Sequence, residues 1–186
     1  MRVAIIYDTS FLMSERYWDI QKYFEEMVER IGNWPPSERI PRALYCGVDW
    51  TTFVPVEVKK EIRGHFENPD KERWAKAARK RLASLLAAGC KEIELSKEAE
   101  PVSYDDLLGA DSDTDKRIVG FAQKLSYRTV KFGIVFVASD DGGILCDVAK
   151  MNRAKGLNAF GVTPDNEQNE SRKSVLSAIS KISGIV

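Results

Sequence analysis

Short apolar runs alternate with longer amphipathic stretches along this chain. The run over residues 3–7 is rich in β-branched side chains and stops abruptly at Asp8. The run over residues 134–137 stops in the same way shortly before Asp140. Uninterrupted apolar runs of this length are typical of strands that are buried on both faces of a parallel sheet. We therefore predict two central strands that place Asp8 and Asp140 at the same edge of the sheet, where ligands bind in such folds.

Between these runs, hydrophobic residues recur at three- and four-residue steps, which is the period of an amphipathic helix. The first predicted helices cover about residues 17–31, 55–63 and 69–88, and a terminal helix covers about residues 171–183. Two more are expected to begin at the capping-box pattern of Ser112 and Asp115 and after Gly142-Gly143. Further short strands are expected at residues 51–54, 93–95 and 157–162. This alternation predicts a three-layer α/β/α fold around a central, mostly parallel sheet of four to five strands.

The helix predicted over residues 69–88 has two distinct faces. Its apolar stripe, which we expect to face the core, consists of Trp74, Ala78, Leu82 and Leu85. A basic ridge on another face consists of Arg73, Lys76 and Lys80. A ridge of this kind is either a solvated surface or a place where phosphate groups bind.

The length of 186 residues fits a single domain, with a core over about residues 1–162 followed by the C-terminal helix. The segment over residues 33–49 contains three prolines and cannot form regular helix. It is either an insertion beside a functional site or a long surface loop.

Composition narrows the function classes. The chain carries 28 basic and 28 acidic residues, so contact with nucleic acid would have to come from a local patch. Its three cysteines lack the spacing of a zinc site or a disulfide framework, and the single histidine, His65, has no nucleophile placed to form a triad with it. No apolar run approaches the roughly 20 residues that span a bilayer. We expect a cytoplasmic protein with no membrane contact.

Four acidic residues are placed to meet at one edge of the predicted sheet. Asp8 and Asp140 follow strands directly, and Glu61 and Asp115 lie on helices that can reach the same edge. Each also has a purely structural interpretation, as a helix cap or as part of a solvated helix face. Together, however, four carboxylates would repel one another without a cation, and carboxylates are ligands suited to Mg²⁺ or Mn²⁺. The combination indicates a divalent-cation site and hydrolysis of a nucleic-acid backbone.

The segments that carry these acids resemble, in order, the motifs of the PIN domain family. Residues 3–13 look like the family's opening, a hydrophobic strand followed by Asp-x-Ser/Asn and a hydrophobic pair. Residues 53–62 resemble the second motif, in which a proline and a valine precede the metal-facing glutamate. This match selects Glu61 over Glu57.

The third and fourth motifs are found in the C-terminal half. Asp115, three residues before an isoleucine on a predicted helix, matches the third motif and is favoured over Asp113. Residues 136–143 are similar to the fourth, where the family usually has a threonine or serine two residues before the aspartate. Ala138 occupies that position, so the hydroxyl is either missing or supplied by Ser139. The related NYN nucleases also end a strand in an Asp-Gly-rich turn.

The resemblance implies a metal-dependent ribonuclease, as in bacterial toxins and RNA-processing enzymes. In this chain it implies a catalytic and metal-binding set of Asp8, Glu61, Asp115 and Asp140, with Mg²⁺ or Mn²⁺ as cofactor. Asp113 or Asp141 would be an additional outer ligand. Thr9 or Ser10 would steady a carboxylate or the scissile phosphate. The expected partners are RNA, a protein partner or inhibitor, and a second copy of the chain.

Two other functions compete with this hypothesis. One is a PIN-like module that binds RNA or a protein and has lost cleavage. The other is a phospho-acceptor signalling domain of doubly wound type. Against the latter, the first strand ends in one aspartate rather than a pair, and no lysine follows a late strand in the expected place.

Overall fold

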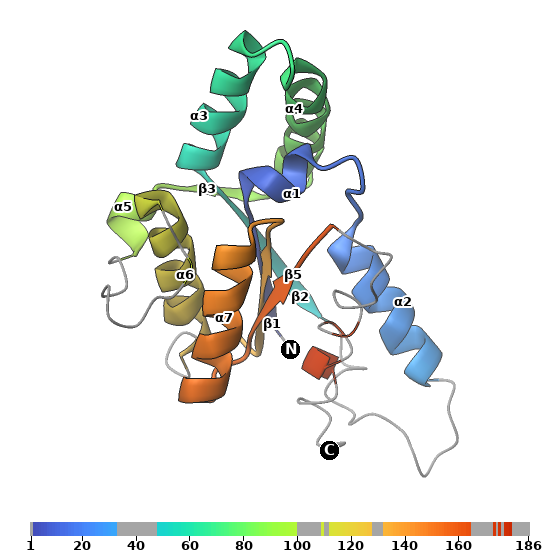
Figure 1. Cartoon of the computed structure of the whole chain (residues 1–186). Helices are drawn as coiled ribbons and strands as arrows, with labels where there is room; N and C mark the ends of the chain where they lie inside the picture. Colours follow the sequence, from blue (N-terminus) through green and yellow to red (C-terminus); the bar gives the residue numbers. More distant parts are fainter. Residues whose placement is uncertain are drawn as a thin grey trace.

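The sheet of this protein is five-stranded and entirely parallel. The computed structural model (Figure 1) describes residues 2–32, 48–99, 109, 112–127, 132–164, 173, 175 and 177–179. Its strands are β1 (Arg2–Tyr7), β2 (Asp49–Pro55), β3 (Lys91–Ile93), β4 (Ile134–Ala138) and β5 (Ala159–Val162). They lie in the order β3-β2-β1-β4-β5, and every neighbouring pair is parallel. The predicted parallel sheet is confirmed.

The two apolar runs occupy the centre of the sheet, as expected. Strand β1 pairs with β2 on one side and with β4 on the other, so that Ile5 lies opposite Thr52 and Phe136. Every residue of β4 is buried, and so is all of β1 after Arg2. Alternate side chains of β1 enter two separate hydrophobic cores, with Ile5 in one and Ile6 in the other. Burial on both faces explains why these strands are uniformly apolar rather than alternating.

Helices cover both faces of the sheet and give the predicted three layers. They are α1 (Thr9–Met13), α2 (Ile20–Gly32), α3 (Val56–Gly64), the 3₁₀ turn η3 (His65–Glu67), α4 (Glu72–Ala87), α5 (Leu95–Glu98), α6 (Asp113–Ser126) and α7 (Gly142–Lys155). The first core receives side chains from α1 to α4, and the second receives side chains from α5, α6 and α7. Figure 1 shows α6 and α7 together, well separated from α2. None of the helices in the described part of the chain is long and apolar enough to cross a membrane.

The strand order reverses between β1 and β4. The chain first adds β2 and β3 on one side of β1 and then adds β4 and β5 on the other. The amide of Asp8 donates a hydrogen bond to the carbonyl oxygen of Ala138 at 2.9 Å, which joins the carboxyl ends of the two central strands. In open parallel sheets, ligands bind beside such a reversal, outside the carboxyl ends of the strands.

Two local expectations were wrong. Strand β3 ends at Ile93, and Leu95 begins the short helix α5 and is fully buried there instead of continuing the strand. On α4 the buried face is centred on Ala75, Ala78 and Leu82, so Trp74 lies at its edge and remains 38% exposed rather than entering the core.

Two predicted segments lie largely outside the described residues. The Pro-rich segment over residues 33–49 is described only from residue 48 onward, where Asp49 begins β2. Of the terminal helix predicted over residues 171–183, the described positions 173, 175 and 177–179 are helical. Among these, Val175, Ala178 and Ile179 are buried in the first core.

Candidate functional site

Asp8 lies at the carboxyl end of β1 and is only 6% exposed. Its Oδ2 atom accepts hydrogen bonds from Ser10 Oγ at 2.6 Å and from Ser139 Oγ at 2.8 Å. Burial raises the pKa of Asp8, and the nearby charge of Glu61 raises it further, whereas the hydrogen bonds from Ser10, Ser139 and the Thr9 backbone act in the opposite direction. The hydrogen bonds therefore hold the carboxylate in one orientation, while burial makes its charged form less favourable.

Two serines connect the ends of the central strands. The hydroxyl oxygens of Ser10 and Ser139 lie 3.2 Å apart. Ser10 Oγ also accepts from the amide of Asp140 at 2.7 Å, and Ser139 Oγ accepts from the amide of Asp141 at 3.0 Å. The sequence left open whether the hydroxyl usual two residues before Asp140 is missing or is supplied by Ser139. The structure favours Ser139, because its hydroxyl lies beside Asp8 and Ala138 has none.

Five carboxylates line one pocket of about 420 Å³ at this edge of the sheet. They come from the end of β1, from α3, and from the N-terminal ends of α6 and α7. The five are Asp8, Glu57, Glu61, Asp115 and Asp141. The hydroxyl-bearing residues Thr9, Ser10, Ser112 and Thr114 line the same pocket, so its donor atoms are all oxygen.

The two glutamates of α3 are one helical turn apart and both reach the pocket. Thr9 Oγ1 donates to Glu61 Oε2 at 2.7 Å, and His65 Nε2 lies 3.8 Å from the other oxygen of the same carboxylate. Glu57 Oε2 accepts a long hydrogen bond, 3.5 Å, from the amide of Leu95 at the start of α5. The sequence resemblance selected Glu61 over Glu57, but both side chains line the pocket.

Asp115 lines the pocket and also caps α6. Its amide donates to Ser112 Oγ, and its Oδ2 accepts from the Ser112 amide, both at 3.1 Å, which completes the predicted capping box. The structural and functional interpretations of Asp115 are thus compatible. Asp113 does not line the pocket, because its carboxylate pairs with Arg117 at 2.7 Å on an exposed side of α6.

The side chains of the two neighbouring aspartates after β4 have different surroundings. Asp140 is exposed, and its Oδ1 accepts from Thr163 Oγ1 at 3.1 Å, outside the pocket. Asp141 lines the pocket, and its Oδ1 caps α7 by accepting from the amides of Gly143 at 2.7 Å and Ile144 at 3.1 Å. The helix cap considered for Asp140 therefore belongs to Asp141. An aspartate immediately before the two glycines was the sequence signal for this cap.

The residues of the basic ridge lie away from the acidic pocket. Arg73 is highly exposed and lies 3.5 Å from a carboxylate oxygen of Glu15, and Lys76 pairs with Glu72 at 2.7 Å. Lys80 is also exposed and does not line the acidic pocket.

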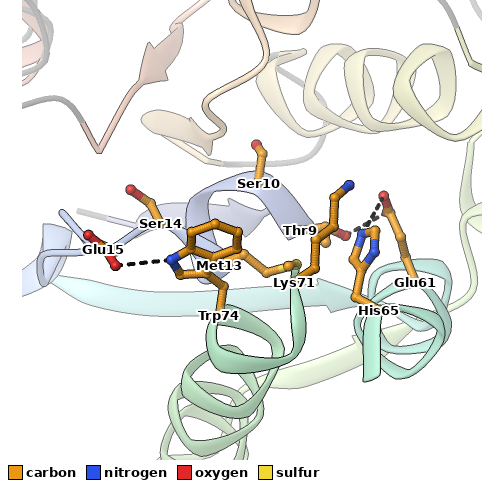
Figure 2. A pocket seen from close by; sticks show the side chains of 9 residues that line it. All are labelled: Thr9, Ser10, Met13, Ser14, Glu15, Glu61, His65, Lys71 and Trp74. Atoms are coloured by element: carbon orange, nitrogen blue, oxygen red, sulfur yellow. Dashed lines mark hydrogen bonds and ion pairs between the residues drawn. The ribbon is translucent and has the colours of Figure 1, made fainter. Parts of the chain in front are cut away.

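A second cleft of about 440 Å³ adjoins the acidic pocket and shares Thr9, Ser10 and Glu61 with it (Figure 2). Its opposite wall includes Lys71 and Trp74, neither of which the sequence indicated as a site residue. Trp74 points outward because the buried face of α4 is formed by Ala75, Ala78 and Leu82.

The chemistry of the acidic pocket fits a hard divalent cation. Its lining has no cysteine or histidine, and oxygen-only sites rich in carboxylates suit Mg²⁺ and Mn²⁺. As the side chains stand, no three acidic, histidine or cysteine residues of the described ranges form a group that could hold an ion. Each of the five carboxylates instead accepts at least one hydrogen bond from a hydroxyl or amide group. Since an ionised carboxylate offers about four acceptor positions, such bonds are compatible with cation binding.

No known protein family and no curated protein matches this chain in sequence comparisons.

Proposed function

We propose that this protein is a Mg²⁺- or Mn²⁺-dependent endoribonuclease. The observation that carries the proposal is the pocket at the strand-order reversal, where five carboxylates from four separate elements face one space of about 420 Å³. Like charges at such density are costly unless a cation neutralises them. The order of the four acidic segments along the chain, which resembles that of PIN domains, supports RNA as the substrate.

Asp8, Glu61 and Asp115 would hold the ion, with Asp141 completing the set in place of Asp140. A bound divalent ion supplies activation of water and neutralisation of charge on a phosphodiester. The chain's own contribution is to fix the ligands. Ser10 and Ser139 orient the Asp8 carboxylate, and Thr9 orients Glu61 through a 2.7 Å hydrogen bond.

The hydroxyl groups at the start of α1 would also position the substrate. Thr9 and Ser10 line both the acidic pocket and the adjoining cleft, so a phosphate between the two would lie beside them. Arg81 fixes this short helix, because its guanidinium donates to the carbonyl oxygens of Leu12 and Ser14, both at 2.6 Å.

The proposed place of action is the cytoplasm.

A cleavage assay tests the proposal. Single-stranded and structured RNAs are incubated with the protein and Mn²⁺, with and without a chelator, beside the Asp8→Asn variant. Cleavage by the wild type that chelator and the substitution both abolish is the expected result. Absence of cleavage by the wild type, or equal cleavage by the variant, would contradict the nuclease.

A PIN-like binding module without cleavage is the second candidate. The observation in its favour is that Asp115 and Asp141 each cap a helix, so these two acids have a structural task that needs no metal. RNA binding that chelator does not change, together with no cleavage, would favour this candidate.

A further inference from the structure

The cleft beside the acidic pocket contains a large exposed aromatic side chain, that of Trp74. Among the described residues, Trp74 and Tyr127 are the large hydrophobic side chains classed as exposed, at 38% and 45%. Trp74 is held in place, because its Nε1 donates to Glu15 Oε1 at 3.1 Å. The same oxygen lies 3.5 Å from the Arg73 guanidinium. An indole that is both exposed and fixed is suited to stacking against a planar ligand.

A cation lies in the same cleft. Lys71 immediately precedes α4 and lines the cleft together with Trp74. Thr9 and Glu61, which also line the acidic pocket, line the cleft with it (Figure 2). Within the described part of the chain, Lys71 takes part in no ion pair. Its ammonium group is therefore available to a ligand anion.

The two cavities share part of their lining. Thr9, Ser10 and Glu61 line both of them, so a ligand that fills the cleft borders Glu61, one of the five carboxylates. A volume of about 440 Å³ lies within the usual range for small-molecule sites, roughly 300–1,000 Å³. A nucleotide combines a flat base with a phosphate, which matches an aromatic ring and a lysine in one cleft.

We propose that this cleft is a subsite for an unpaired nucleobase of single-stranded RNA, which stacks on Trp74 while an adjacent phosphate contacts Lys71. This inference rests on the proposed nuclease function, since the strand would continue from the cleft into the acidic pocket. Stacking does not read sequence, because every base has a flat face. The subsite therefore selects unpaired strands rather than a particular base.

Binding measured without cleavage tests the subsite. A fluorescently labelled single-stranded oligoribonucleotide is titrated in chelator with the wild type, Trp74→Ala, Trp74→Phe and Tyr127→Ala, and the dissociation constants are compared by anisotropy. Tyr127→Ala is the matched control, because it removes a similarly exposed aromatic ring outside the cleft. Thermal melting checks that each variant is folded.

The expected result is that Trp74→Ala weakens binding by roughly 5- to 150-fold, the range for loss of one base–aromatic stack. Trp74→Phe retains most of the affinity, and Tyr127→Ala matches the wild type. An oligonucleotide with abasic positions removes the difference between the wild type and Trp74→Ala. The inference is overturned if Trp74→Ala binds like the wild type, if Tyr127→Ala weakens binding equally, or if the wild type binds no RNA.

Lys71 is tested in the same assay by its salt dependence. Lys71→Ala should lower the slope of log affinity against log salt concentration by about 0.7, the value for one phosphate contact with a single strand. Lys80→Ala, on α4 but outside the cleft, should leave the slope unchanged. An unchanged slope for Lys71→Ala would overturn its part of the subsite.

Cleavage in Mn²⁺ separates this inference from the proposed function. RNA binding that depends on Trp74, without any cleavage, would contradict the proposed nuclease function and support the nucleobase subsite. Cleavage and binding that are both unaffected by Trp74→Ala would leave the nuclease intact and contradict the subsite.

Discussion

Ser139 donates a hydrogen bond of 2.8 Å to the carboxylate of Asp8, although the two residues lie 131 positions apart and follow different strands. Both side chains are buried, and Ser139 is fully so. Hydrogen bonds to charged groups contribute about 1.5–3 kcal/mol. This contact therefore matters for the stability of the strand ends and for the orientation of Asp8.

Replacing Ser139 by alanine should lower both stability and cleavage. The substitution removes a donor to Asp8 and an acceptor for the Asp141 amide, so we expect a loss of about 1–3 kcal/mol in the free energy of unfolding. Urea denaturation measures this loss. Ser14→Ala is a control, because the one hydrogen bond of its hydroxyl within the described residues is an exposed bond from the amide of Arg16. Equal stability of Ser139→Ala and the wild type would contradict the structural role.

The buried carboxylate of Asp8 should make stability depend on pH. Burial raises the pKa of Asp8 in the folded protein above its value in the unfolded chain. A group with a raised acid pKa favours the folded state at low pH, and this contribution is lost as the pH rises through the elevated pKa. At neutral pH without divalent ions, Asp8→Asn should therefore melt at a higher temperature than the wild type, by about 2–4 °C for a gain of 1 kcal/mol.

The advantage of Asp8→Asn should shrink as the pH falls, because the wild-type carboxyl becomes neutral. Melting curves from neutral to acid pH, recorded in chelator, measure it. Added Mn²⁺ should raise the melting temperature of the wild type and not that of Asp8→Asn. A melting difference that is the same at every pH would show that the charge of Asp8 is not its cause.

The neighbouring aspartates after β4 can be distinguished by paired substitutions. Asparagine is as good a helix cap as aspartate, so Asp141→Asn should keep α7 stable while it removes a charge from the pocket. We expect this variant to lose cleavage by at least about tenfold, the effect of roughly 1.4 kcal/mol. Asp140→Asn should retain most activity, because that side chain faces Thr163. Loss of cleavage in Asp140→Asn, with activity retained in Asp141→Asn, would instead support Asp140 as the metal ligand, as expected from the sequence.

Thr9 should act through Glu61. Thr9→Val keeps the size of the side chain but removes the hydroxyl that donates to Glu61 at 2.7 Å. The expected result is a loss of cleavage of about tenfold or more, since a hydrogen bond to a charged group contributes about 1.5–3 kcal/mol. Thr9→Ser keeps the donor and should restore activity. If Thr9→Ser is as impaired as Thr9→Val, the methyl group rather than the hydroxyl is important.

Gly143 should tolerate no larger side chain. A Cβ atom built on it would overlap the carbonyl oxygen of Gly109, a clash that only backbone movement can relieve. Overpacking of this kind costs about 1–3 kcal/mol, so Gly143→Ala should be destabilised by that amount. Gly142→Ala is the control, because nothing lies within 4 Å of a Cβ at that position. Thermal melting compares the two variants, and equal melting temperatures would contradict the close approach.

The sheet and the region of the site could be predicted from sequence because both depend on short-range patterns. Apolar runs that end in an acid locate the central strands and their carboxyl ends, as at Asp8. The capping box at Ser112 and Asp115 is likewise a local pattern, and the structure contains it.

The positions that sequence did not resolve depend on packing across the fold. The outward placement of Trp74 follows from which residues of α4 meet the core, and the exchange of Asp140 for Asp141 follows from where α7 begins. Lys71 became a candidate only because η3 and α4 bring it beside α1. These positions depend on how helices and strands pack against one another, and the spacing of residues along a single helix or strand does not reveal that packing.

The reversal of strand order between β1 and β4 also affects when the pocket can form during synthesis. Asp8, Glu57 and Glu61 come from the first third of the chain, whereas Asp115, Ser139 and Asp141 come much later. A growing chain thus has every element from β1 to α4 before it has the strand that brings Ser139 to Asp8. The complete pocket is consequently absent from every nascent chain that ends before residue 141, so the acidic residues cannot act together until Asp141 has been added.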